Sequence, residues 1–325
     1  MCTAFTYCAK EFYFGRTLDL EQSFGEEITV TPRNFPLHFR SGMVLEQHHA
    51  IIGVAHVEEG YPLYYDAVNE HGLVMAGLNF PDFAHYAPPA EGKDNVTHFE
   101  LILWFLAQCA SVQEVRPLLE RLNITDIPFG PKFPPASLHW IISDSKESVV
   151  VESMKDGLWV HPNPAGVLTN NPPFPMQMLR LADFMDLSSR PPENHFPFPL
   201  PVYSRGLGST GLPGDLSSSA RFVRAAFGAW NASSGTTEAE HIAQVFHIAE
   251  TVSQTRGCCH LEEGQCQFTR YTVCIDAQQG IYYYTTYDRR RITAVELRQE
   301  NLQGAAPVRF PMLTQEDIFY QKESS

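Results

Sequence analysis

The order of strand-like and helix-like segments constrains the fold of this chain more than any other feature of its sequence. β-Branched and aromatic runs between turn residues predict strands, and apolar residues at helical spacing predict helices. The predicted segments in chain order are strands within 2–80, helices at 98–110 and 111–123, strands within 137–163, helices at 217–230 and 236–254, and strands within 267–297.

This order suits two stacked sheets with helices on both outer faces. The turn at 69–72 joins two strands and indicates an antiparallel meander. Capping boxes at Ser111 and Glu114 and at Thr237 and Glu240 predict the starts of two helices, one of which contains Pro117. We therefore predict an α+β fold, a four-layer αββα sandwich, as a single domain over residues 1–325.

The segment from Pro172 to Pro213 is rich in proline and aromatic residues. Its phenylalanines need a surface on which to pack, so a plain linker between domains is a poor interpretation. We predict a long excursion from the domain, with residues 188–214 taking part in assembly.

Charge and hydropathy exclude several classes of function. Acidic side chains outnumber basic ones by 37 to 23, a formal charge of −14, which disfavours binding to nucleic acid and to anionic membranes. The longest apolar run covers 101–107, far short of the roughly 20 residues of a membrane span. No segment resembles a signal peptide, so we expect a cytoplasmic protein.

The cysteines and histidines do not predict a metal site. Seven cysteines in a reducing compartment argue against a disulfide framework. In the segment 257–266, adjacent Cys258 and Cys259 lack the spacing of a structural zinc site, and we predict a loop. The histidines at 48 and 49 are predicted to lie in a solvated turn. We expect neither a metal nor another cofactor.

Cys2 directly follows the first methionine. If Met1 is removed, Cys2 carries a thiol and a free α-amine on one Cα, and the amine, with a pKa of about 7.7–8.0, can serve as its base. The alternative is an inert residue near a frayed end. If residues 2–20 form a hairpin, Arg16 and Asp19 lie near the amine, where Arg16 favours the thiolate and Asp19 holds the ammonium.

Seven motifs, in order along the chain, resemble the choloylglycine hydrolase family of bile salt hydrolases and penicillin V acylases. They are MCT, FGRTLD, NEHGLVMAGLNFP, LHWIISD, GVLTNNPPF, GLPGDLSSSARFVRAAF and GIYYYTTYD. The resemblance covers nearly the whole chain. It implies an N-terminal nucleophile hydrolase that cleaves a non-peptide amide, and the catalytic residues it carries over are Cys2, Arg16, Asp19, Asn79, Asn170 and Arg221.

The chemistry of amide cleavage agrees with these positions. Each tetrahedral oxyanion needs preorganised donors, which Asn79 and Asn170 can supply as side-chain amides. Arg221 lies near the start of a helix, where a cation gains nothing from the dipole, and this favours a role in the site. Its neighbour Arg224 is predicted to be solvated or ion-paired.

Asn79 resembles the bile salt hydrolases, because typical penicillin V acylases carry tyrosine there. The resemblance therefore implies conjugated bile salts as substrates, with release of glycine or taurine. A sterol body needs an apolar pocket, for which we expect Leu18, Phe24, Phe129 and Phe133. The resemblance also implies a homotetramer, in which residues 203–214 reach a neighbouring subunit.

Three alternatives stay open. The chain can be a penicillin V acylase or an acylase of acyl-homoserine lactones with the same catalytic set. It can be a papain-like cysteine hydrolase with one of the thirteen histidines as base. It can also be a binding or assembly protein on the same fold.

Overall fold

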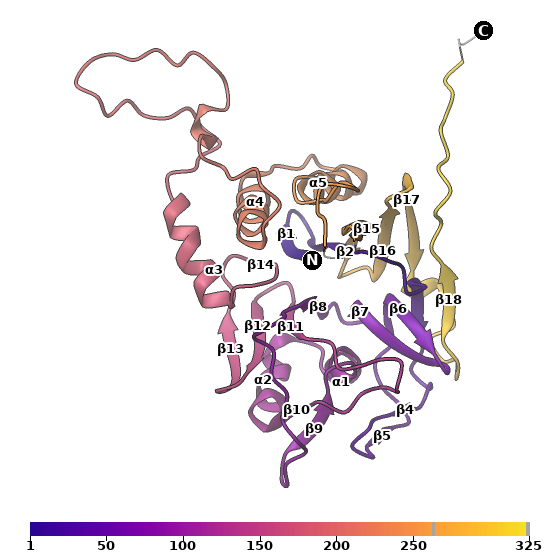
Figure 1. Ribbon diagram of the computed structural model, residues 1–325. Helices are drawn as coiled ribbons and strands as arrows, with labels where there is room; N and C mark the ends of the chain where they lie inside the picture. The colour runs from indigo at the N-terminus through magenta and orange to yellow at the C-terminus, as the bar shows by residue number, and fades with distance from the viewer. Residues whose placement is uncertain (262–263, 323–325) are drawn as a thin grey trace.

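The fold consists of four layers, with two antiparallel sheets stacked between two pairs of helices (Figure 1). A computed structural model describes residues 1–261 and 264–322. Helices α4 (Ser218–Asn231) and α5 (Glu238–Glu250) cover one sheet, and α1 (Leu101–Gln108), with α2 (Val112–Arg121) nearby, covers the other. The predicted αββα arrangement is confirmed.

The first sheet combines the N-terminal hairpin with three strands from residues 268–296. Its six strands in spatial order are β14 (Val167–Leu168), β1 (Cys2–Cys8), β2 (Phe12–Leu20), β15 (Phe268–Asp276), β16 (Ile281–Thr286) and β17 (Arg289–Glu296). Because β1 pairs with β2 on one side and β14 on the other, the start of the chain lies against the segment that leads to Asn170.

The second sheet is the predicted meander with flanking strands. Its eight strands in spatial order are β13 (Gly157–Pro162), β12 (Ser148–Met154), β11 (Leu138–Ser143), β8 (Val74–Asn79), β7 (Tyr61–Asn69), β6 (Ile51–Glu58), β3 (Glu27–Thr31) and β18 (Val308–Pro311). Two short pairs lie outside both sheets, β9 (Asp94–Thr97) with β10 (Leu122–Thr125) and β4 (Leu37–His38) with β5 (Val44–Leu45).

Alternation along the strands builds two cores. In β8, Val74, Ala76 and Leu78 belong to the core between the sheets, whereas Met75 packs with helix α1 on the opposite face. Since both faces of this sheet are covered, its strands are apolar on both sides.

The helix starts follow the predictions with one correction. Thr237 and Glu240 form the complete capping box of α5. At α2, Ser111 accepts a hydrogen bond from the Glu114 backbone, but the Glu114 carboxylate accepts from the backbone of Ala110. A capping box requires the Glu114 carboxylate to accept from the Ser111 backbone, so this part of the prediction was wrong.

The proline-rich segment contains a helix that we did not predict. Helix α3 (Phe174–Leu181) begins directly after Pro173, and a 3₁₀ turn at Ala182–Phe184 follows. Proline is tolerated there because the first helical positions have no intrahelical acceptor for an N–H. Both elements precede the excursion predicted around 188–214, and Figure 1 shows a loop after them that projects from the layered body. Its apolar side chains Phe196, Phe198, Leu200, Val202 and Tyr203 are exposed.

No helix in the described part of the chain has the length and apolar character needed to cross a membrane.

Candidate active site

The β1–β2 hairpin places an arginine beside the Cys2 thiol. Cys2 pairs with Leu18, and Ala4 pairs with Arg16, so the side chains of Cys2, Leu18 and Arg16 share one face of the sheet. Nη2 of Arg16 lies 3.7 Å from Sγ of Cys2, and both residues are buried. The hairpin thus places a buried guanidinium directly at the sulfur atom of Cys2.

Arg16 is held in place by a group that sequence reasoning missed. It pairs with the carboxylate of Asp66 on β7 and donates to the backbone oxygen of Gly77 at 2.8 Å. Asp66 also accepts hydrogen bonds from the hydroxyls of Tyr271 and Tyr282. Burial lowers the pKa of the Arg16 guanidinium, but Tyr271 and Asp66 outweigh this and raise it. In the sequence, the indication of this group was an acidic residue, Asp66, within a largely apolar strand.

Asn170 links the first residue of β1 to the end of β8. Its Oδ1 accepts hydrogen bonds of 2.8 Å from the backbone nitrogen of Cys2 and from Nη2 of Arg221. Its Nδ2 donates to the backbone oxygen of Asn79 at 2.7 Å. One amide hydrogen of Asn170 is therefore committed to Asn79, and the second has no recorded partner among the described residues. Asn79 is itself exposed at the end of β8.

Arg221 is fully buried on helix α4 and reaches across to β1. Its Nη1 donates to the backbone oxygen of Cys2 and to Oγ1 of Thr3, the latter at 2.6 Å. Burial lowers the pKa of this guanidinium, and Asp19 opposes the shift. The prediction for Arg224 was wrong, because Arg224 is buried and donates to the backbone oxygens of Pro213, Asp215 and Thr251.

Asp19 lies beside the amino terminus with one oxygen unused. The Met1 amine donates to the backbone oxygen of Asp19 at 2.8 Å, and the backbone nitrogen of Asp19 donates to the Met1 oxygen at 2.9 Å. Oδ1 of Asp19 accepts from Thr269 at 2.7 Å, whereas its buried Oδ2 has no partner among the described residues. Burial raises the pKa of this carboxyl against the pull of Arg221 and the amino terminus.

Of the four predicted pocket residues, Leu18 adjoins Cys2 in the sheet register. Phe129 and Phe133 pack edge to face, with ring centroids 6.0 Å apart, and join Tyr61 in one aromatic cluster. Phe133 also packs on His56. Phe24 is exposed in the loop after β2.

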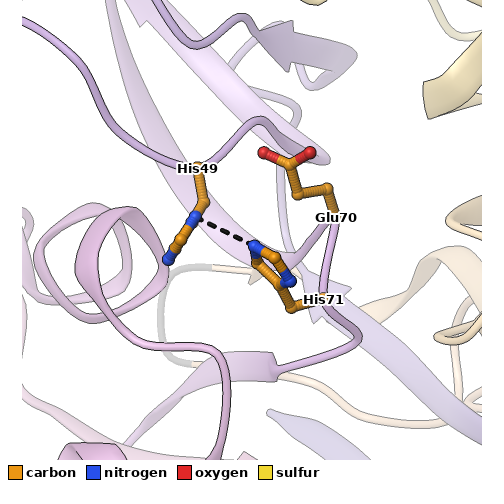
Figure 2. Close-up of side chains that lie close together, drawn as sticks. All are labelled: His49, Glu70 and His71. Atoms are coloured by element: carbon orange, nitrogen blue, oxygen red, sulfur yellow. Dashed lines mark hydrogen bonds between the residues drawn. The ribbon is translucent and has the colours of Figure 1, made fainter.

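One cluster of potential metal ligands lies away from these residues. His49, Glu70 and His71 come together beside the β7–β8 turn, and Nε2 of His71 lies 3.0 Å from Nδ1 of His49 (Figure 2). The Glu70 carboxylate already pairs with Arg33 and accepts from the backbone of Ala50. These contacts compete with a metal ion for its oxygens.

The predicted solvated turn at 48 and 49 was wrong. His48 is buried, and its ring nitrogens lie 2.6 and 2.8 Å from the backbone oxygens of His49 and Phe35. The loop predicted at 257–266 includes residues 262 and 263, which lie outside the described residues. Around them, Cys259 and Gln267 are joined by a backbone hydrogen bond.

Comparisons with known proteins cover nearly the whole chain. The family described as linear amide C–N hydrolases, choloylglycine hydrolase family, matches residues 2–310. A bile salt hydrolase/transferase of Lactiplantibacillus plantarum is 46% identical over 98% of this chain and 99% of its own length. A second protein of that name, from Clostridium perfringens, is 37% identical over 94% of each chain.

Solved structures agree with the fold. A mutant of the conjugated bile acid hydrolase from Clostridium perfringens superposes with a TM-score of 0.91 at 34% identity, covering 99% of this chain and 100% of that one. A penicillin V acylase from Agrobacterium tumefaciens has a TM-score of 0.78 at 21% identity, covering 95% of this chain and 91% of that one. The second likeness concerns the fold alone.

Proposed function

Because the chain belongs to the choloylglycine hydrolase family of linear amide C–N hydrolases, we propose that it is a bile salt hydrolase acting through a thioester on Cys2. The substrates are glycine- and taurine-conjugated bile salts. The observation that carries the proposal is the buried contact of Arg16 with the Cys2 thiol, next to the Asn170 and Arg221 bonds to the Cys2 backbone. The names of the similar bile salt hydrolases support the substrate class.

The reaction begins after removal of Met1, which turns the Cys2 backbone nitrogen into an α-amine. Asn170 Oδ1 already faces this nitrogen, and the unused oxygen of Asp19 suits an ammonium ion. The amine takes the thiol proton and Arg16 stabilises the thiolate. The thiolate attacks the amide carbon, and the developing oxyanion is stabilised by the side chain of Asn79 and the free hydrogen of Asn170.

Three proton transfers complete the cycle. The Cys2 ammonium protonates the leaving nitrogen, the C–N bond breaks, and glycine or taurine departs, leaving the bile acyl group on sulfur. The amine then removes a proton from water, which attacks the thioester. The C–S bond breaks, the free bile acid leaves, and the ammonium returns its proton to the sulfur, which restores the thiol. The proposed steps need no metal or cofactor.

The substrate pocket is proposed around Leu18, Phe24, Phe129 and Phe133. A rigid sterol requires apolar walls and few polar contacts, and the aromatic cluster of Phe129 and Phe133 supplies such a wall. The side chain of Asn79 supports bile salts over penicillin V. Binding of nucleic acid or of a membrane is no part of the proposal.

We also propose that the single domain assembles as a homotetramer in the bacterial cytoplasm. All seven cysteines are free, which fits a reducing compartment. The excursion carries exposed Phe196, Phe198 and Tyr203, and exposed Met185 and Trp230 line a hollow between α3 and α4. Such surfaces suit a second copy of the chain. Replacing Phe196, Phe198 and Tyr203 by serine should lower the mass measured by light scattering; an unchanged tetramer would remove the excursion from the interface.

One preparation tests the main proposal by intact mass and by release of amine. The substrates are glycocholate, taurocholate, penicillin V and an acyl-homoserine lactone. The expected result is loss of one methionine together with glycine and taurine release, abolished by Cys2→Ala. Cys8→Ala is the matched control, because Cys8 is exposed at the far end of the same strand.

Other outcomes separate the alternatives. Turnover of penicillin V or the lactone without turnover of bile salts would reassign the substrate class. Full activity with Met1 retained would exclude the α-amine as base and favour a histidine. Processed protein that turns over none of the four would leave a different amide or a binding function.

A further inference from the structure

His139 and Glu152 form a fully buried pair next to the Asn170 segment. They lie opposite one another on β11 and β12, and Nδ1 of His139 is 3.0 Å from Oε1 of Glu152. The ring of Phe80 stacks on the imidazole with centroids 4.2 Å apart and nearly parallel planes. The mechanism above uses neither residue of the pair.

Both ring nitrogens of His139 face oxygens that can only accept hydrogen bonds. Nε2 lies 2.9 Å from the backbone oxygen of Thr169, while Nδ1 faces the Glu152 carboxylate. Burial raises the pKa of Glu152, but His139 at 3.0 Å and the nearby His161 at 3.6 Å outweigh it and lower the pKa to about 2, so the acid is ionised at neutral pH. The ring therefore lies within hydrogen-bond distance of both groups at once and bridges the carboxylate to the Thr169 carbonyl.

The pair makes hydrogen bonds to the backbone on both sides of Asn170. His139 holds the carbonyl of Thr169, one residue before Asn170, and Glu152 accepts from the backbone nitrogen of Phe174, the first residue of helix α3. Between these points, the Asn170 backbone donates to Oγ of Ser218 at 2.8 Å. The peptide that carries Asn170 is thus fixed on a sheet and two helices.

We infer that the buried His139–Glu152 pair is a positioning device that sets Asn170 against the Cys2 nitrogen. This inference rests on the proposed function, since it assigns the pair to the same reaction. Neither residue needs to touch substrate. A displacement of about 1 Å at a reacting group can cost on the order of 100-fold in rate, so the loss of one of these backbone hydrogen bonds should appear in kcat.

The test compares His139→Gln with His161→Gln. Glutamine can donate to Thr169 or to Glu152, but it cannot bridge them as the two ring nitrogens of His139 do. His161, on β13, lies 3.6 Å from the other oxygen of the same carboxylate. Its replacement removes a neighbouring histidine but leaves the contacts with Thr169 and Phe174 in place. Glu152→Asp keeps the charge and withdraws it from Phe174, and serves as the second test variant if His139→Gln does not fold.

For His139→Gln, kcat on the best amide substrate should fall by about 10- to 100-fold, while KM stays within about threefold. Alkylation of Cys2 by iodoacetamide should keep its rate, because Arg16 does not contact the pair. Glu152→Asp should lower kcat in the same way, and His161→Gln should stay within about threefold of the wild type.

The inference is overturned if folded His139→Gln keeps its kcat, if the loss appears only in KM, or if His161→Gln loses as much. Wild-type protein that releases no amine from any substrate counts against the proposed function. Active wild type with an unaffected His139→Gln counts against the positioning role alone.

Discussion

The carboxamide oxygen of Asn170 lies 2.8 Å from the backbone nitrogen of Cys2. The same side chain donates from Nδ2 to the backbone of Asn79, so a single residue joins the nucleophile to the end of β8. In the proposed reaction, this nitrogen becomes the catalytic amine. Asn170 therefore sets the distance between the base and the place where the oxyanion develops.

Asn170→Ala should lower kcat by about 100-fold or more, the usual cost of losing an oxyanion donor. It also frees Arg221 from one of its acceptors. The measurement is steady-state amine release from glycocholate and taurocholate. Asn171→Ala is the matched control, because among the described residues the Asn171 side chain bonds only to the Pro81 backbone, through Nδ2, and the variant should stay within about threefold. Equal losses in the two variants would contradict the role of Asn170.

Asp19→Asn should stabilise the form that retains Met1 at neutral pH. Burial raises the pKa of this carboxyl above its ordinary 3.8. Stability from such a group is fully present below pH 3.8 and is lost as pH rises through the higher folded value. The asparagine mimics the neutral acid, so its advantage in urea unfolding should be present at pH 7 and vanish towards pH 3.

In the processed enzyme, Asp19→Asn should shift the pH dependence of activity. Without the carboxylate, the ammonium form of Cys2 loses an opposite charge, so the amine should titrate at lower pH by about 1 unit. The pH dependence of kcat/KM reports this limb. An unshifted limb would mean that Asp19 does not face the amine.

Asp66→Asn should destabilise the fold by about 3–5 kcal/mol, because it leaves the buried Arg16 cation without its partner. Tyr282→Phe removes one hydrogen bond to the same carboxylate and should cost only about 1 kcal/mol. Unfolding in urea, followed by tryptophan fluorescence, gives both free energies. Similar costs for the two variants would show that the ion pair contributes little.

Glu152→Gln should cost about 3 kcal/mol at pH 7. The pKa of Glu152 falls from its ordinary 4.5 to about 2, and each pH unit corresponds to 1.36 kcal/mol. For a lowered pKa, the stabilisation is present above pH 4.5 and is lost as pH falls towards 2. Unfolding curves of the two proteins should therefore converge over that interval. A gap that persists at pH 2 would assign the cost to packing.

Short-range patterns in the sequence predicted much of the fold. Alternation and turns identified the β1–β2 hairpin, and with it the meeting of Arg16 and Cys2. The same rules missed helix α3, because prolines at 172 and 173 look like helix breakers until the helix starts after them. They also misjudged Arg224, whose acceptors are backbone oxygens of Pro213, Asp215 and Thr251 that only the tertiary fold brings together.

The surroundings of the site depend on contacts far apart in the chain. Asp66 meets Arg16, Tyr271 and Tyr282 across the two sheets. His139 meets Thr169, the residue after β14, because β14 of the first sheet contacts β11 of the second. Neither meeting has a local sequence signal beyond a polar residue in an apolar strand. The family motifs contained Arg16, which contacts the thiol, and Asn170 and Arg221, which bind the Cys2 backbone. The supporting residues Asp66 and His139 required the structure.

The pairing of Met1 with Asp19 has a consequence for timing. Met1 extends β1 by one residue, with its amine bonded to Asp19 and Gln267 and its carbonyl bonded to Asp19. These bonds hold the half-buried amino terminus in the folded hairpin. On the proposed mechanism, we therefore expect Met1 to be removed faster before the hairpin closes than after it. A molecule that folds with Met1 in place should release no amine from substrate until that residue is removed.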